Sequence, residues 1–194
     1  WVISFLGAMY AGVVPVAVNT LLTAADYAYM LEHCRAQAIL TNGALVPVVQ
    51  QALEQAQHEV NHIWVARPDE APQGLPPAFE PLQPWLQQQT PLAHAARTVG
   101  DDPGFWLYSS GSTGKPKGAV HTHANPYWTA ELYGKPVLGL AEQDVCFSAA
   151  KLYFAYGLGN ALTFPLSVGA SVVLMAERPT PAATFARWTG ATPA

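Results

Sequence analysis

One segment near the middle of the chain, YSSGSTGKPKG at residues 108–118, gathers residue types that bind phosphate. Its glycines allow the backbone to bend so that several N–H groups converge on one anion. Its Ser and Thr hydroxyls add hydrogen-bond donors and its lysines add positive charge, and each charge-assisted bond contributes about 1.5–3 kcal/mol. The composition therefore predicts a polyphosphate-binding loop made of Ser109, Ser110, Gly111, Ser112, Thr113, Gly114, Lys115, Lys117 and Gly118.

The spacing of this loop excludes the two commonest phosphate loops. A Walker A loop has two glycines five residues apart, followed by Lys and then Ser or Thr. Neither Gly111 nor Gly114 is followed by a glycine at that distance. The dinucleotide-binding pattern G-x-G-x-x-G also fails, because Gly157 and Gly159 are followed by Leu162 where the third glycine belongs. The loop must therefore belong to another class.

Two pairs of histidines have the spacing of metal ligands, but neither pair predicts a metal site. His58 and His62 match the zinc-protease pattern H-E-x-x-H, which requires one continuous helix and a third ligand. The sequence from residue 62 instead predicts a strand, so we expect a solvated helix end. His121 and His123 are spaced to share one face of a strand, but no Cys, Asp or Glu nearby completes a ligand set. We expect this second pair to pack or to support the loop.

The composition limits what kind of protein positions this loop. The 194 residues can form one sizeable core or two small domains. With 51% hydrophobic and 11% charged residues, the chain is not disordered throughout. A net charge of −4 argues against nucleic-acid binding, which needs a basic face. Cys34 and Cys146 are too far apart in the sequence for a metal or redox motif, and such lone cysteines suit a reducing cytoplasm.

The uncharged stretch at residues 1–25 raises the question of a membrane span. A spanning helix needs about 20 consecutive apolar residues. Gly12 and Pro15 divide this stretch into a helix that ends near Ala11 and an apolar strand at 13–18. A parallel strand covered on both faces is apolar throughout. We therefore expect a buried strand and no membrane contact.

Strand and helix patterns alternate along the chain, which predicts an α/β fold with a largely parallel sheet flanked by helices. The predicted strands lie at 13–18, 38–41, 63–65, 105–108, 119–121, 144–149 and 170–175. Four helices are predicted at 23–34, 45–57, 157–166 and 179–189. A further helix is expected to end near residue 11, and another to begin near residue 125. Residues 67–100 are rich in Pro and Gln, so we expect a surface excursion with one short helix there.

The loop resembles the phosphate loop of the adenylate-forming superfamily, which includes acyl-CoA synthetases, luciferases and the adenylation domains of peptide synthetases. The Ser/Thr/Gly run closed by Pro116-Lys117-Gly118 carries the resemblance, and the segment KLYFAYGLGN at 151–160 is similar to the benzoate–CoA ligase branch. Residues 67–100 carry no recognisable motif. The resemblance implies that residues 1–194 are part of the large N-terminal AMP-binding domain, with the C-terminal domain absent.

The resemblance also implies an aryl-acid pocket lined by Ala155, Tyr156, Gly157 and Phe164. If a helix runs from Gly157 past Phe164, the rings of Tyr156 and Phe164 can face one cavity. The alternative is that these aromatic residues belong to the core. Amino-acid-activating relatives have an Asp at the position of Ala155, so an α-amino acid substrate is disfavoured. Lys151 either steers the carboxylate or caps a strand, and we favour the second role.

The activity implied by the resemblance is the ATP-dependent conversion of benzoate to an aryl-adenylate and then to aryl-CoA. ATP, Mg²⁺ and CoA are the expected cofactors, with Thr113 and Lys117 contacting the phosphates directly. The adenylation lysine is expected in the C-terminal domain, so no catalytic residue is assigned here and these residues alone are expected to be inactive. A hydroxybenzoate, an aminobenzoate or a medium-chain fatty acid are alternative substrates, and a non-catalytic nucleotide-binding module is an alternative function. A homodimer is one of the oligomeric states left open.

Overall fold

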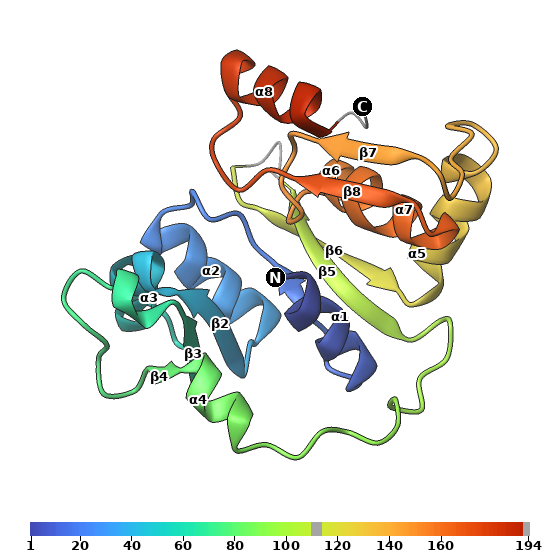
Figure 1. Ribbon diagram of the computed structural model, residues 1–194. Helices are drawn as coiled ribbons and strands as arrows, with labels where there is room; N and C mark the ends of the chain where they lie inside the picture. The colour runs from blue at the N-terminus through green and yellow to red at the C-terminus, as the bar shows by residue number, and fades with distance from the viewer. Residues whose placement is uncertain (110–113, 192–194) are drawn as a thin grey trace. The chain divides into compact units, whose positions relative to one another are not determined.

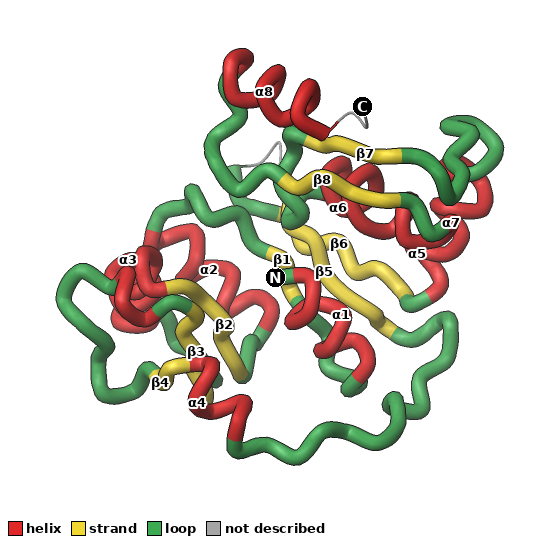
Figure 2. Tube along the Cα trace, in the orientation of Figure 1, coloured by secondary structure: helices red, strands yellow, loops and turns green. Residues whose placement is uncertain are grey.

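The computed structural model of this chain describes residues 1–109 and 114–191. Its elements fall into two compact units. One unit contains residues 1–19, 95–109 and 118–191, and the other contains residues 20–94 and 114–117. Figure 1 follows the chain through both units, and Figure 2 distinguishes helices, strands and loops. The α/β architecture with parallel strands flanked by helices confirms the predicted fold class.

A three-stranded sheet in the order β1-β5-β6 carries the loop strands in the first unit. Its strands are β1 (Val16–Ala17), β5 (Pro103–Ser109) and β6 (Lys117–Thr122), and β1 runs parallel to β5. Phe105 and Leu107 are two residues apart on β5 and therefore share one face. Both pack into a buried cluster with Phe5 of α1 (Val2–Tyr10). This packing fixes β5, and the candidate loop starts at the end of that strand.

The entry into β1 differs from the expected strand at 13–18. Gly12 has φ +73 after the last turn of α1, and its N–H donates to Met9 O while the next N–H, of Val13, donates to Ala8 O. This is the hydrogen-bond pattern of a Schellman cap, which uses the first residues of the expected strand to end the helix. Val13 is consequently exposed, and the strand that pairs with β5 is shortened to Val16–Ala17.

Helical segments pack against a second parallel sheet in the same unit. This sheet pairs β7 (Val145–Ser148) with β8 (Ser171–Leu174). Between them the chain forms α6 (Ala155–Leu158), the π-helix η4 (Gly159–Thr163) and α7 (Phe164–Val168), which confirms the predicted helix in a longer, locally widened form. The remaining helices are α5 (Ala124–Thr129), the π-helix η3 (Ala130–Gly134) and α8 (Pro181–Ala191). Figure 1 shows α6 and α7 beside the β7–β8 pair.

The second unit is a small parallel sheet in the order β2-β3-β4. Its strands are β2 (Ala38–Asn42), β3 (His62–Ala66) and β4 (Glu80–Pro81), and the helices α2 (Ala24–Cys34) and α3 (Val46–Gln55) pack on each other. Short 3-10 turns, η1 (Gly43–Leu45) and η2 (Pro68–Glu70), complete the connections. The Pro-rich stretch contains the expected short helix, α4 (Leu82–Gln87). It also contributes strand β4 and the buried Phe79, which the sequence did not predict.

Two expectations about histidines are settled by element boundaries. Helix α3 ends at Gln55, and His62 begins β3, so no continuous helix joins His58 to His62. The expectation that His121 and His123 share one strand face is wrong. Strand β6 ends at Thr122, because its N–H donates to Asn125 Oδ1 at 3.0 Å and His123 already has helical backbone angles. Throughout 1–109 and 114–191, no three His, Cys, Asp or Glu side chains cluster as metal ligands.

The apolar N-terminal stretch contains a helix of nine residues, α1. Within the described part of the chain, none of the helices combines the length and apolar character that crossing a membrane requires.

Candidate functional site

The candidate phosphate site lies at the connection between β5 and β6. Ser109 is the last residue of β5 and is exposed, and Lys117 is the first residue of β6. Ser110, Gly111, Ser112 and Thr113 lie outside the described residues. The described part of the loop therefore consists of its two ends, which start and finish on neighbouring strands of one sheet.

Two glycines at this connection have different structural roles. Gly114 has φ +88, a left-handed conformation that side chains with a Cβ rarely adopt. A Cβ there would meet no atom within 4 Å, so backbone conformation and not space requires glycine. Gly118 is constrained by space instead, because a Cβ would lie 3.0 Å from a ring carbon of Trp106. Both glycines thus suit the backbone shape that was predicted for the loop.

Two exposed ammonium groups stand on either side of Pro116 at the end of the loop. The side chains of Lys115 and Lys117 are both exposed to solvent. Lys115 Nζ lies 5.2 Å from the centroid of the Tyr29 ring of α2, within cation–π distance. The negative face of the ring attracts the ammonium group and gives it a defined position beside the loop. No local sequence pattern links Tyr29 to the loop, so only the tertiary structure reveals this contact.

Aromatic stacking joins β5 and β6, the two strands that the loop connects. The ring of Phe105 on β5 stacks on His121 of β6, with centroids 4.8 Å apart and planes 12° from parallel. Phe105 also contacts Phe5 of α1, edge-on at 5.4 Å. His121 therefore packs against the strand pair, as the sequence led us to expect, and joins the two strands that flank the loop.

The residues predicted to line the aryl pocket lie in different environments. Ala155 and Tyr156 begin helix α6, and both are exposed, Tyr156 at 72%. Phe164, at the start of α7, is only 9% exposed, and its ring centroid lies 5.8 Å from that of Tyr133. A Cβ on Gly159 would lie 2.8 Å from the Phe164 ring. The assignment of these residues to one pocket stays a prediction.

Gly157 allows the exposed start of α6, Ala155 and Tyr156, to pack close to the loop that precedes it. It is buried, and a Cβ at this position would lie 2.1 Å from the carbonyl oxygen of Lys151. Glycine is therefore the residue that allows helix α6 to start directly against the backbone of the preceding loop. Asn160 adds a second restraint, since its Nδ2 donates to Tyr156 O at 2.9 Å. The helical i to i−4 spacing of these two residues is the signal that could have predicted this bond.

Lys151 caps the end of a strand, which is the role that the sequence favoured. Its Nζ donates to the carbonyl oxygens of Met175, Ala176 and Glu177, the three residues that follow β8, at 2.6, 3.1 and 2.6 Å. An ammonium group has three N–H donors. All three therefore have a backbone acceptor, which leaves none for a substrate carboxylate in this conformation.

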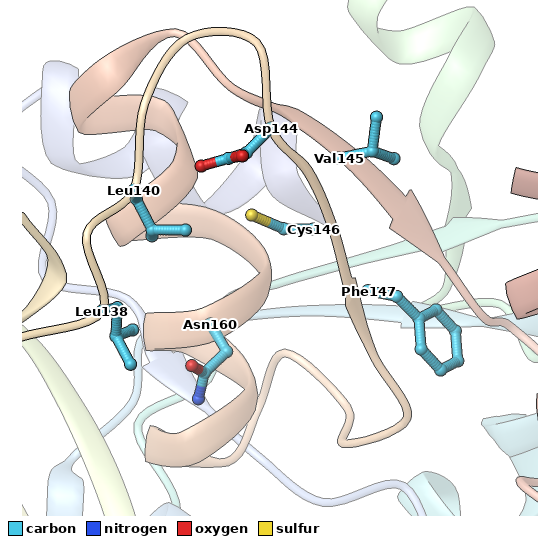
Figure 3. Close-up of a pocket in the computed structure, with 7 residues that line it drawn as sticks. All are labelled: Leu138, Leu140, Asp144, Val145, Cys146, Phe147 and Asn160. Carbon is cyan, nitrogen blue, oxygen red and sulfur yellow. The ribbon is translucent and has the colours of Figure 1, made fainter. Parts of the chain in front are cut away.

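A hollow beside β7 was not predicted from the sequence. It has a volume of about 390 Å³ and is lined by Leu138, Leu140, Asp144, Val145, Cys146, Phe147 and Asn160. In Figure 3 the side chains of Leu138, Leu140, Cys146 and Asn160 lie on one side of β7, and those of Val145 and Phe147 lie on its other side. Burial, and to a lesser extent the nearby Asp144 carboxylate, raises the pKa of the Cys146 thiol. Asp144 also accepts from the N–H of Ala141 at 2.8 Å, so it caps a turn. The thiol is therefore held protonated at neutral pH and is a poor nucleophile.

The fold and the loop together define the class of protein. Parallel α/β units with a Gly-, Ser-, Thr- and Lys-rich connection between two strands are the architecture of the N-terminal domain of adenylate-forming enzymes. The chain belongs to the AMP-binding enzyme family, whose match covers residues 1–192.

Three related proteins show which branch of the family this chain resembles. The benzoate–CoA ligase of Thauera aromatica is 51% identical over 184 residues, which are 95% of this chain and 33% of that protein. The crystal structure of a benzoate CoA ligase from Burkholderia xenovorans LB400 has a TM-score of 0.81 and 57% identity, and covers 95% of this chain and 34% of that one. The anthranilate CoA ligase AuaEII in complex with anthranoyl-AMP has a TM-score of 0.81 and 36% identity, over 90% of this chain and 33% of that one. The chain thus spans about a third of the length of these relatives.

Proposed function

We propose that this chain is part of an AMP-forming acid–thiol ligase that activates an aromatic carboxylate, benzoate, with ATP and transfers it to CoA. The observation that carries the proposal is the 51% identity to a benzoate–CoA ligase across 95% of the chain. The described geometry supports it, because a left-handed Gly114 and two exposed lysines close a loop between strands β5 and β6.

The proposed reaction has two steps. A carboxylate oxygen of the aryl acid attacks the α-phosphorus of ATP, so that a new P–O bond forms and pyrophosphate leaves. The CoA thiolate then attacks the carbonyl carbon of the aryl-adenylate, a C–S bond forms, and AMP leaves. Both steps depend on positioning and on neutralising negative charge. We assign the loop, Ser109 to Gly118, to the β- and γ-phosphates and the departing pyrophosphate, with Thr113 and Lys117 in direct contact.

Magnesium fits this proposal as an ion carried by the nucleotide. The backbone N–H and ammonium groups of the loop donate to phosphate oxygens, and its Ser and Thr hydroxyls can either donate to phosphate or ligate the ion. Mg²⁺ prefers oxygen ligands and binds mostly through substrate phosphates and water. The phosphates of ATP would therefore hold the ion and the loop would hold the phosphates.

The aryl acid is proposed to bind beside the start of α6, at Ala155, Tyr156, Gly157 and Phe164. Aromatic rings and small residues suit a flat apolar ring, since ring pairs gain about 0.5–1.5 kcal/mol beyond burial of area. Ala155 provides no carboxylate to pair with a substrate ammonium group, which argues against an α-amino acid. An aminobenzoate is the alternative that a specific observation favours, because a relative of the same fold binds anthranoyl-AMP at 36% identity.

We further propose that residues 1–194 belong to an N-terminal AMP-binding domain, with the adenylation lysine on a separate C-terminal domain. The relatives are about three times longer than this chain, which supports that division. The proposed compartment is the reducing cytoplasm, because Cys34 and Cys146 are too far apart in the sequence to form a metal or redox motif.

The experiment that tests the proposal is carboxylate-dependent ATP–pyrophosphate exchange by a full-length enzyme that carries these residues. Benzoate, 2-aminobenzoate, octanoate and phenylalanine are compared at equal concentrations. We expect the fastest exchange with benzoate. Fastest exchange with octanoate or phenylalanine would contradict the proposed pocket and retain the role of the loop. A folded enzyme that binds ATP and exchanges with none of the four acids would instead be a non-catalytic nucleotide-binding module.

A further inference from the structure

Lys151 joins two segments that are distant in the sequence. It lies between β7 and α6, and its ammonium group binds three consecutive carbonyl oxygens after β8, the nearest two at 2.6 Å. The same residue is fixed through its own backbone. Its carbonyl oxygen accepts from the N–H of Phe154 at 3.1 Å and occupies the space that a Cβ at Gly157 would need. The side chain of Lys151 thus binds the segment after β8, and its backbone binds the turn before α6. We call this pair of contacts the junction.

The segment that this junction positions is the one proposed to bind the aryl acid. Ala155 and Tyr156 follow Phe154 directly and are exposed, so few contacts of their own side chains restrain them. Their placement comes from the backbone on both sides: the turn at Lys151 before them, and the bond from Asn160 to Tyr156 O after them. A shift of the turn at Lys151 would therefore move both residues.

We propose that Lys151 is a positioning residue of the acid site, which ties the turn before α6 to the strand end after β8 and so sets where Ala155 and Tyr156 meet the ring of the substrate. This inference rests on the proposed function. It does not require contact between Lys151 and the substrate, because the three N–H donors of the ammonium group already bind carbonyl oxygens.

Methionine is the most informative replacement for Lys151. Like lysine, it has an unbranched stem of similar length, but it lacks the ammonium group and therefore all three donors. The carbonyl oxygens of residues 175–177 then lose their shared partner, and the turn before α6 loses its side-chain tie to the strand end after β8. Arginine is the second variant, because it keeps the charge, but its planar fork cannot direct three N–H groups from one nitrogen.

Arg187 offers a matched control on the same stretch of chain. Its guanidinium binds the carboxylate of Glu177 at 2.8 Å, and both side chains are about half exposed. Replacing Arg187 by methionine removes one positive charge beside the side chain of Glu177 and removes none of the three donors of Lys151. The control therefore separates loss of charge from loss of the junction.

The experiment measures steady-state kinetics of a full-length enzyme with K151M, K151R or R187M, using benzoate and 4-methylbenzoate. We expect K151M to raise the KM for benzoate about tenfold or more, as small displacements at a substrate site do, while the KM for ATP changes less than about twofold. We also expect its preference for benzoate over 4-methylbenzoate to fall. K151R should lie between K151M and the wild type, and R187M should resemble the wild type.

Each other outcome overturns the inference in a recognisable way. If K151M weakens both acids by one factor and keeps their ratio, Lys151 contacts the shared carboxylate and does not position the ring site. If R187M matches K151M, the effect is one of charge. If K151M does not fold, K151R decides, and an unchanged KM for benzoate in K151R refutes the proposal. A wild-type enzyme that exchanges with no aryl acid refutes the proposed function itself, whereas normal wild-type exchange with unaltered K151M kinetics refutes this inference alone.

Discussion

At the scale of single residues, the candidate phosphate site depends on what glycine alone can do. Gly114 has φ +88 and open space around the position of a Cβ, whereas Gly118 lies against the ring of Trp106. The first glycine is required for backbone conformation and the second for close packing. A substitution at Gly114 thus alters the direction of the loop without creating a clash, which makes it the better probe of function.

We predict that Gly114→Val lowers ATP turnover of a full-length enzyme at least about tenfold, because a displaced loop loses its alignment with the phosphates. A β-branched residue at positive φ also costs about 1–2 kcal/mol of stability. Gly74 provides the control, since it has φ +75, equally open surroundings and no place in the proposed site. Gly74→Val should lose similar stability, measured by urea denaturation, and keep its turnover. Full activity of Gly114→Val would contradict the role of the loop.

At the scale of elements, local signals define the helices, and distant contacts define where they begin and end. Helix α2 has a complete capping box, in which Asp26 N donates to Thr23 Oγ1 at 3.2 Å and Thr23 N donates to an Asp26 carboxylate oxygen at 3.1 Å. The motif needs only two residues three positions apart, so it is a local signal that can be found in the sequence. Helix α1 ends in a Schellman cap that also shortens β1, and that cap depends on Gly12.

The capping box predicts a pH dependence of stability. Hydrogen bonds from Thr23, first from its hydroxyl and then from its N–H, lower the pKa of Asp26. The ionised carboxylate therefore stabilises the fold above its unfolded pKa of about 3.9, and this contribution is lost as the pH falls through the lower folded value. Thr23→Ala should cost about 1 kcal/mol at pH 7, as loss of an N-cap does.

The measurement is urea denaturation of the wild type, Thr23→Ala and Asp26→Asn between pH 7 and pH 2.5. The wild type should lose more stability on acidification than Asp26→Asn, which has no carboxylate to protonate at this position. Equal pH dependence of the two proteins would show that the capping box contributes nothing to acid stability.

At the scale of the whole molecule, the chain contains the proposed phosphate loop and part of the proposed acid site, and spans about a third of the length of its relatives. The adenylation lysine is proposed to lie on a separate C-terminal domain. Side chains such as Tyr127, Trp128 and Leu132 are exposed around α5 and η3.

We predict that these 194 residues alone show no benzoate-dependent ATP–pyrophosphate exchange, because the proposed C-terminal lysine is needed for adenylation. A full-length enzyme carrying the same residues should exchange under identical conditions. The comparison uses equal molar amounts of both proteins, with retention of secondary structure checked by circular dichroism. Exchange by the 194 residues alone would mean that adenylation needs no group from another domain.

Much of the architecture was predictable because its signals are local. Alternating apolar runs and turn residues indicate the strands and helices of an α/β fold, and the run of Gly, Ser, Thr and Lys between two strands indicates a phosphate loop. Boundaries were less predictable. Strand β6 ends at Thr122 because Asn125 binds its N–H, and the Pro-rich stretch supplies the buried Phe79.

Only the tertiary structure decided which residues far apart in the chain are in contact. Lys151 binds carbonyl oxygens 24 to 26 positions away, and Lys115 lies over the ring of Tyr29 on another element. The sequence by itself determined the residue types, their local conformations and the family. It favoured a strand cap for Lys151 but could not decide which carbonyl oxygens the ammonium group binds, because that depends on which separate strands end beside one another.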